Sequence, residues 1–219
     1  MFFGVSYRVY ALFFIVSIIF IFFPQIDLYI TDNFYLEESK FFLKHELWVK
    51  ILYHSVKPLL IGTMVVVVGL WIYNKKTKKT ILYINGKVVL YLVVVLAIAP
   101  GLIVNTMLKE NMGRSRPVNI VKYGGEQEFT PAFIVGNRIP KNASFSSGHA
   151  AGAYFTIALA LLARRHKNVY LSSAIVYGSA VGLGRIAEGG HFFSDVVTSF
   201  FIVYIVSKTT YYFFFERDI

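Results

Sequence analysis

Long uncharged runs of apolar residues are the feature that most constrains how this chain can fold. Four runs cover Val9–Ile26, Pro58–Asn74, Val88–Leu108 and Asn168–Gly184. Two more, Ala150–Ala163 and Val196–Phe215, are shortened or interrupted by polar groups. Because about 20 helical residues cross the apolar core of a bilayer and charges are costly there, we interpret all six as transmembrane helices. The sequence therefore predicts an all-α polytopic membrane protein with one domain over residues 1–219.

The composition supports this fold class and limits the kinds of partner that the protein can be expected to bind. Of the 219 residues, 56% are hydrophobic and only 16% are charged, which is unlike a soluble globular domain. A net charge of +10 would suit nucleic acid, but the basic residues lie at the borders of the apolar runs. We therefore expect the membrane bilayer and its anionic head groups, and no nucleic acid, as partners. No protein partner is predicted.

Two connections between the predicted spans are rich in basic residues. They carry Lys75, Lys76, Lys78, Lys79 and Lys87 in the first, and Arg164, Arg165 and Lys167 in the second. Since such loops stay on the cytoplasmic side, both are predicted to be cytoplasmic. An even number of spans then puts both termini in the cytoplasm and residues 25–57, 106–148 and 185–195 on the opposite side.

One of these external stretches has an amphipathic pattern. Leu43, Leu47 and Ile51 share a helical face, with Trp48 and Tyr53 nearby. The pattern suits a helix that lies at the membrane surface, and it equally suits a loop helix packed on the bundle.

The second external stretch contains a cluster of cations at residues 109–117. Lys109, Arg114 and Arg116 lie where the third apolar run ends, and Pro117 stops the helix. External cations oppose the usual charge asymmetry, so a specific anion is indicated. A planar guanidinium and an ammonium together suit phosphate oxygens. A basic patch that only touches phospholipid head groups is the alternative.

A second polar cluster, at residues 144–149, opens the next apolar run with the segment SFSSGH. Ser147 and Gly148 at a helix start offer a hydroxyl and free N–H groups, which favour an anion. His149 adds a proton donor whose charge changes near neutral pH. Serine and glycine are also common helix caps, so this cluster alone is weak support for a binding site.

The third cluster, residues 184–195, carries four ionisable groups in an apolar region. His191 and Asp195 are four residues apart, so on a helix the carboxylate can hold the imidazole and leave its other nitrogen nucleophilic. Arg185 can supply another fork for phosphate. The alternatives are a structural hydrogen bond, or half of a metal site with Glu188 as third ligand. The surrounding cations repel a metal ion, so no metal and no cofactor is predicted.

Together, the three clusters resemble the type 2 phosphatidic acid phosphatase (PAP2) superfamily. Its pattern is lysine, six residues and Arg-Pro; then Pro-Ser-Gly-His; then Ser-Arg, five residues, histidine, three residues and aspartate. The matching residues are Lys109 and Arg116–Pro117, then Ser147–Gly148–His149, then Arg185, His191 and Asp195. Ser146 replaces the proline of the second element and Gly184 replaces the serine of the third. Neither departure removes an ionisable group.

The resemblance implies a metal-independent lipid phosphatase, built as a six-transmembrane-helix bundle with a PAP2-type core. It implies that His191 attacks phosphorus, that Asp195 orients His191 and that His149 protonates the leaving oxygen. The residues expected to hold the phosphoryl oxygens are Lys109, Arg116, Ser147, Gly148 and Arg185. Arg114 lies outside the shared pattern, and we expect it to contact the substrate head group.

Looser similarity narrows the substrate to a phosphorylated lipid. The segments PGLIVN, GRSRPV, SFSSGHA and GGHFFSDVV resemble bacterial lipid A phosphatases, above all those that act at the 1-position. This implies an inner-membrane protein whose active site faces the periplasm. Phosphatidylglycerophosphate phosphatases, undecaprenyl pyrophosphate phosphatases and phosphotransferases share the scaffold and stay open as alternatives. A transporter or binder of anionic lipids is the alternative from another class.

Overall fold

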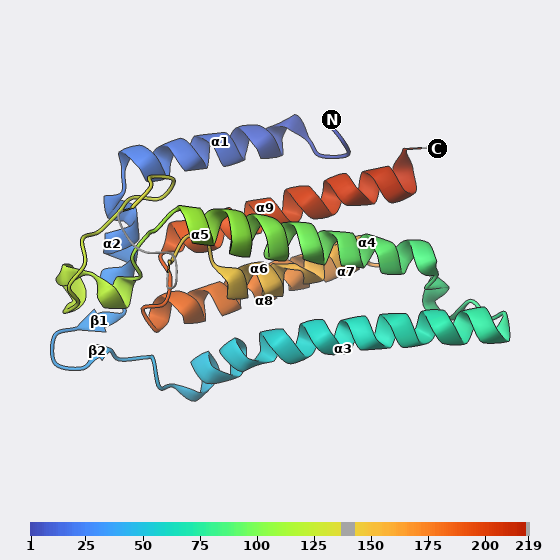
Figure 1. The fold of residues 1–219 in the computed structure, drawn as a ribbon, viewed down its shortest axis with the longest axis horizontal. Coiled ribbons are helices and arrows are strands. Elements are labelled where there is room, and N and C mark those ends of the chain that lie inside the picture. The colour runs from blue at the N-terminus through green and yellow to red at the C-terminus, as the bar shows by residue number, and fades with distance from the viewer. Residues whose placement is uncertain (137–142, 218–219) are drawn as a thin grey trace.

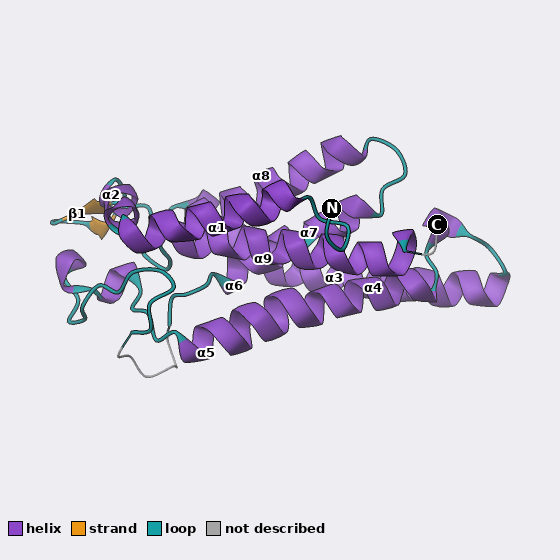
Figure 2. Ribbon diagram, turned by 90° about the horizontal axis from the view of Figure 1, so that it is seen from above, coloured by secondary structure: helices purple, strands orange, loops and turns teal. Residues whose placement is uncertain are grey.

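The computed structural model describes residues 1–136 and 143–217. The long helices form a bundle. At one end of it lie a short helix that runs across the bundle, a two-stranded hairpin and the loop after residue 111 (Figure 1 and Figure 2). The α-helices are α1 (Tyr7–Phe22), α2 (Gln25–Asp32), α3 (Leu47–Thr77), α4 (Gly86–Leu96), α5 (Lys109–Asn111), α6 (Gly148–Tyr154), α7 (Thr156–Leu161), α8 (Lys167–Ala187) and α9 (Phe193–Tyr211). Strands β1 (Tyr35–Leu36) and β2 (Lys40–Phe41) pair antiparallel.

Tighter and wider helical turns complete these elements. A π-helix over Ala97–Leu108 joins α4 to α5, and another over Tyr212–Glu216 extends α9. Short 3₁₀ turns occur at Ile81–Tyr83, Pro117–Asn119 and Val121–Tyr123. Pro100 lies inside the first π-helix, where a missing N–H disturbs the regular hydrogen-bond ladder.

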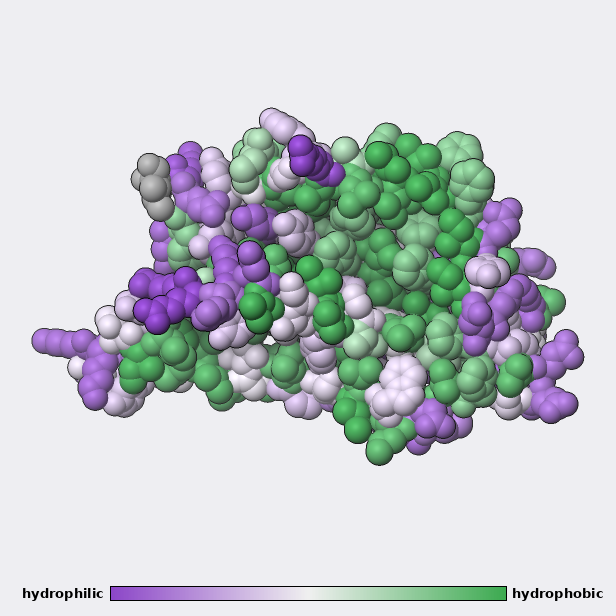
Figure 3. Space-filling view, turned by 180° about the vertical axis from the view of Figure 1, so that it is seen from behind, coloured by the Kyte–Doolittle hydropathy of each residue, from purple (hydrophilic) through white to green (hydrophobic). Residues whose placement is uncertain are grey.

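The predicted count of six spans is not confirmed. Among the described residues, the helices long and apolar enough to cross a membrane are Leu47–Thr77, Gly86–Asn111, Lys167–Ala187 and Phe193–Glu216. A fifth span results if α1 and α2, bent by 82°, are counted as one. The apolar helix Gly148–Leu161 is shorter. Figure 3 shows an apolar surface between hydrophilic groups at both ends, as expected for a multi-pass membrane protein.

The short helix pair α6 and α7 is enclosed by other helices, which explains why bilayer thickness does not set its length. Its buried alanines and glycine allow α8 and α9 to approach closely. Gly178 of α8 lies so near Tyr154 of α6 that an added Cβ would be 2.1 Å from the tyrosine ring. Small residues thus set the spacing of the helices behind the polar end of the bundle.

The first predicted span ends earlier than expected because the chain bends at Pro24. Helix α1 stops at Phe22, and α2 then crosses the polar end of the bundle and packs beside α9 (Figure 1). Proline fixes its own φ and lacks an N–H, so it favours such a break. The bend carries α2 over the start of α9.

Neither of the two separate helices considered for residues 43–53, at the membrane surface or packed on the bundle, is found. Residues from Leu47 onward belong to α3, which continues without a break through Pro58 to Thr77. The exposed residues Leu47 and Ile51 therefore belong to the first turns of α3. Proline within this helix removes one backbone hydrogen bond but does not end it.

The arrangement of loops agrees with the charge pattern. The chain termini and both basic connections lie at one end of the bundle, opposite α2, the hairpin and the start of α9 (Figure 1). The assignment of the basic end to the cytoplasm stays a prediction.

We predict that Gly178→Ala lowers the free energy of unfolding by about 1–3 kcal/mol, because its methyl group would overlap the Tyr154 ring. Thermal unfolding of the protein in detergent measures this. Gly62→Ala in α3 is the matched control, since apart from its own helix backbone and chain neighbours nothing lies within 4 Å of the added Cβ. It should be neutral or slightly stabilising, as alanine favours helices. Equal changes in both variants would contradict the close α6–α8 contact.

Candidate active site

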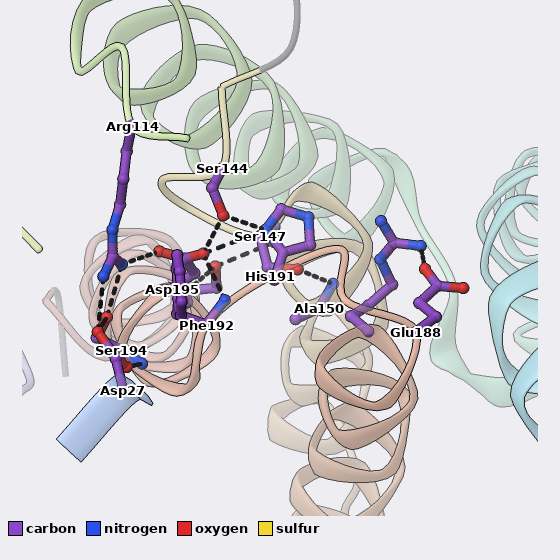
Figure 4. A network of polar contacts seen from close by, with 12 residues as sticks. Asp27, Arg114, Ser144, Ser147, Ala150, Glu188, His191, Phe192, Ser194 and Asp195 are labelled. Carbon is purple, nitrogen blue, oxygen red and sulfur yellow. Dashed lines mark hydrogen bonds and ion pairs between the residues drawn. The ribbon is translucent and has the colours of Figure 1, made fainter. Parts of the chain in front are cut away.

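The three predicted clusters come together at the polar end of the bundle. Lys109 lies in the last turn of the helix Gly86–Asn111, and Arg116 follows in the next loop. Ser147, Gly148 and His149 begin α6, while Arg185 lies in the last turn of α8. His191 and Asp195 follow in the turn into α9 and in its first turn, and Figure 4 shows their side chains next to each other. The eight residues predicted to act in catalysis or to bind the phosphate thus share one end of the molecule.

The start of α6 is shaped by close packing. Ser147 is the N-cap, and its Oγ accepts a hydrogen bond from the Ala150 N–H at 3.4 Å. A side chain at Gly148 would displace Asn105, because an added Cβ would lie 2.6 Å from its Oδ1. Ser199 of α9 donates a hydrogen bond to the Ser147 carbonyl at 3.0 Å. These contacts fix the position of His149.

A tyrosine from α3 lies between two predicted site residues. The Tyr53 ring stacks on His149 with centroids 4.2 Å apart and planes 22° apart. The Arg185 guanidinium carbon lies 5.0 Å from the same ring, within the range of a cation–π interaction. In the sequence, Tyr53 lies near an amphipathic pattern, and it was given no predicted role at the site.

Positive charge is concentrated around His149. Its pKa is lowered to about 4, first by burial and then by the positive charges around it, which are those of Arg185, Lys109, Lys57 and Arg116. An imidazole surrounded by cations is neutral at pH 7. The same cations are suited to a dianion, and a bound phosphate would favour protonation of this histidine.

His191 is held against Asp195, although the pair does not share a helix as predicted. His191 precedes α9, and its Nδ1 lies 3.4 Å from Asp195 Oδ2 and 3.4 Å from Ser144 Oγ. With Nδ1 facing these oxygens, Nε2 is the nitrogen left for substrate. The pKa of His191 is lowered to about 3, mainly by burial; Asp195 opposes this shift, and the charges of Arg185 and Arg116 contribute to it. The imidazole is therefore neutral, as a nucleophile requires.

Asp195 is itself surrounded by donors. Its Oδ2 accepts hydrogen bonds from the Phe192 N–H at 2.9 Å and from the Ser144 hydroxyl. Its Oδ1 accepts a hydrogen bond from Arg114 at 2.6 Å. A carboxylate in the first turn also stabilises the helix, because it meets free N–H groups there. Ser144 was inside a predicted element but had no predicted role.

The head-group contact predicted for Arg114 does not fit the structure. Its side chain is 0% exposed and forms ion pairs with Asp195 at 2.6 Å and Asp27 at 2.7 Å. Burial lowers the pKa of Arg114, but the two carboxylates more than offset this and raise it. The guanidinium also packs over the Phe192 ring at 4.3 Å. Because each of its three nitrogens donates to a protein group and the side chain is fully buried, Arg114 supports the site from behind.

Glu188 does not join His191 in a metal site. It forms an ion pair with Arg185 one turn earlier, as Figure 4 shows for the Glu188 carboxylate. Within residues 1–136 and 143–217, no three His, Cys, Asp or Glu side chains are grouped as a metal site would need. Glu188 therefore balances a cation of the site.

Comparison with known proteins finds similar sequences that cover most of the chain. A profile of the PAP2 superfamily matches residues 88–219. The lipid A 4′-phosphatase of Francisella tularensis subsp. novicida (strain U112) is 33% identical over 188 residues, which is 82% of each chain. The lipid A 4′-phosphatase of Rhizobium leguminosarum is 34% identical over 103 residues, 47% of this chain and 44% of that protein. No solved structure matches.

We predict that nitrogen NMR finds His191 neutral at pH values where a histidine with the ordinary pKa of 6.5 already titrates. Arg185→Gln removes a cation that disfavours the imidazolium, so the pKa of His191 should rise. Arg165→Gln, in the connection at the opposite end, is the matched control and should leave it unchanged. A His191 that titrates near 6.5 in the wild type would contradict its burial as a neutral nucleophile.

Proposed function

The chain belongs to the PAP2 superfamily and is a phosphoric monoester hydrolase, and we propose that it removes a phosphate from lipid A through a phosphohistidine. The observation that carries this proposal is the buried, neutral His191 facing Asp195, with His149 and several cations beside it. Two histidines and an array of cations supply a nucleophile, an acid and charge stabilisation within one site.

In the proposed reaction, His191 Nε2 attacks phosphorus and the bond to the lipid oxygen breaks. His149 gives its proton to that oxygen, so the lipid leaves as an alcohol. Asp195 stabilises the positive charge that develops on His191 during the attack. Water then attacks the phosphohistidine, loses a proton to His149 and releases inorganic phosphate. The chemistry needs no metal, because fixed cations and N–H donors offset the charge of the phosphoryl oxygens.

Each of the remaining predicted residues has a place in this reaction. Lys109, Arg116 and Arg185 carry the positive charge that acts on His149. We propose that they hold the equatorial phosphoryl oxygens together with Ser147 and Gly148. If an alcohol attacked the phosphohistidine in place of water, the protein would be a phosphotransferase. This is the alternative within the superfamily.

For the position of the phosphate, we propose the 4′-position of lipid A. The support is that both similar proteins reported above carry this activity in their names. The 1-position, which looser sequence similarity favoured, stays a prediction that the same assay tests. We further propose the bacterial inner membrane as the location, with the site on the periplasmic side and both termini in the cytoplasm, because the basic connections lie at the opposite end.

The test is phosphate release from lipid A by the purified protein in excess EDTA, with mass spectrometry of the product. We expect loss of the 4′-phosphate and a decrease in kcat of at least about a thousandfold for His191→Ala, since the nucleophile is lost. His45→Ala, an exposed histidine outside the site, is the control and should retain activity.

Other outcomes distinguish the alternatives. Loss of the 1-phosphate would keep the chemistry and change the position. Release only from phosphatidylglycerophosphate or undecaprenyl pyrophosphate would overturn lipid A as substrate. Binding of these lipids without any release would support the transporter or binder.

A further inference from the structure

We propose that Asp27, from the N-terminal helix α2, is a positioning residue for the nucleophile and acts through Arg114 and Asp195. The proposal rests on the proposed role of His191. It adds to the site a residue far from all three sequence clusters and outside residues 88–219, which match the superfamily profile. Figure 4 shows the side chains in a row, from Asp27 past Arg114 and Asp195 to His191.

The first step is the position of Asp27. Its side chain is 0% exposed. Oδ1 accepts a hydrogen bond from the Ser194 N–H at 2.8 Å, and Oδ2 accepts one from the Ser194 hydroxyl at 2.5 Å. Ser194 lies in the first turn of α9, where N–H groups have no partner within the helix. Asp27 thus caps the helix that carries Asp195.

The second step is the orientation of Arg114. Nη2 donates a hydrogen bond to Asp27 at 2.7 Å, while Nη1 donates to Asp195 at 2.6 Å. Nε donates to the Thr130 carbonyl at 2.8 Å, and Nη1 also reaches Ser194 Oγ at 2.8 Å. These contacts hold the planar fork from three sides. Its position relative to Asp195 therefore depends on Asp27.

The third step is charge. Asp27, Arg114 and Asp195 together carry a net charge of −1 in a region closed to solvent. With Asp27 present, Arg114 is shared between two carboxylates. Without that second negative charge, Arg114 would neutralise Asp195 alone, and Asp195 would stabilise a positive His191 less. Phosphoryl transfer places positive charge on His191, so Asp27 favours the transition state from a distance.

The role proposed for Asp27 is more than holding α2 against the rest of the protein. A second aspartate of α2 provides the matched comparison. Asp32 lies at the end of the same helix and forms an ion pair with Lys122 at 2.7 Å, with both side chains partly exposed. It also accepts a hydrogen bond from Tyr123 at 2.8 Å. This carboxylate anchors α2 but has no contact with α9 or Arg114 among the described contacts.

The experiment compares Asp27→Asn with Asp32→Asn in the full-length protein. Asparagine keeps the shape and removes the charge. We expect Asp27→Asn to lower kcat about 10- to 100-fold with KM unchanged, as for other residues that orient a reactive group from behind. Asp32→Asn should keep the wild-type kcat, and Asp27→Glu should recover part of the loss. Thermal unfolding of each variant shows whether the protein is folded.

A second measurement needs no substrate. In nitrogen NMR of the folded protein, Asp27→Asn should change the Nδ1 signal of His191 and reduce the tautomer protonated at Nδ1, and Asp32→Asn should not. Unchanged His191 signals, or a kcat of Asp27→Asn equal to that of Asp32→Asn, would overturn the positioning role. A wild type that releases no phosphate from lipid A would instead overturn the proposed substrate, while the NMR comparison still decides the role of Asp27.

Discussion

A buried arginine shared by two carboxylates joins the N-terminal helices to the catalytic end of this protein. Arg114 lies between Asp27 of α2 and Asp195 of α9, with no exposed surface. Removing one partner of such a buried pair costs about 3–5 kcal/mol, because the remaining charge is left without compensation. The bend at Pro24 is therefore more than a break in an apolar helix, since it brings Asp27 to this arginine.

The site separates two kinds of electrostatic environment around its two histidines. His191 lies on the side of the carboxylates and is kept neutral mainly by burial. His149 lies on the side of the cations, beside Tyr53 and Arg185. A phosphate dianion that enters the site offsets these cations and raises the pKa of His149 from its value of about 4, while the complete burial of His191 still opposes a positive charge there. These two environments suit the proposed roles of His191 as nucleophile and His149 as acid.

The sequence predicted which residues come together at the site better than it predicted the residues that hold them in place. The apolar runs located the long helices, and the spacing of Lys109, Arg116, His149 and His191 identified residues that do meet. Asp27 and Tyr53 were missed because each is a single residue in an apolar or amphipathic run, and no local pattern shows what it faces. Arg114 was misplaced because its sequence neighbours are cations, while its partners come from elements far along the chain. The six-span count is not confirmed, because the helix Gly148–Leu161 is shorter than the candidate spans and α1 and α2 form one span only if the bent pair is counted together.

The most direct test uses lipid A that is labelled in its phosphate. The wild-type protein is quenched rapidly without acid during turnover, and the position of the label on the protein is then mapped. We predict an acid-labile, base-stable phosphoryl group on His191 that forms and decays at the rate of turnover, and that is absent in His191→Ala. Phosphate release at the full rate with no label on the protein, or with label on another residue, would contradict His191 as the nucleophile.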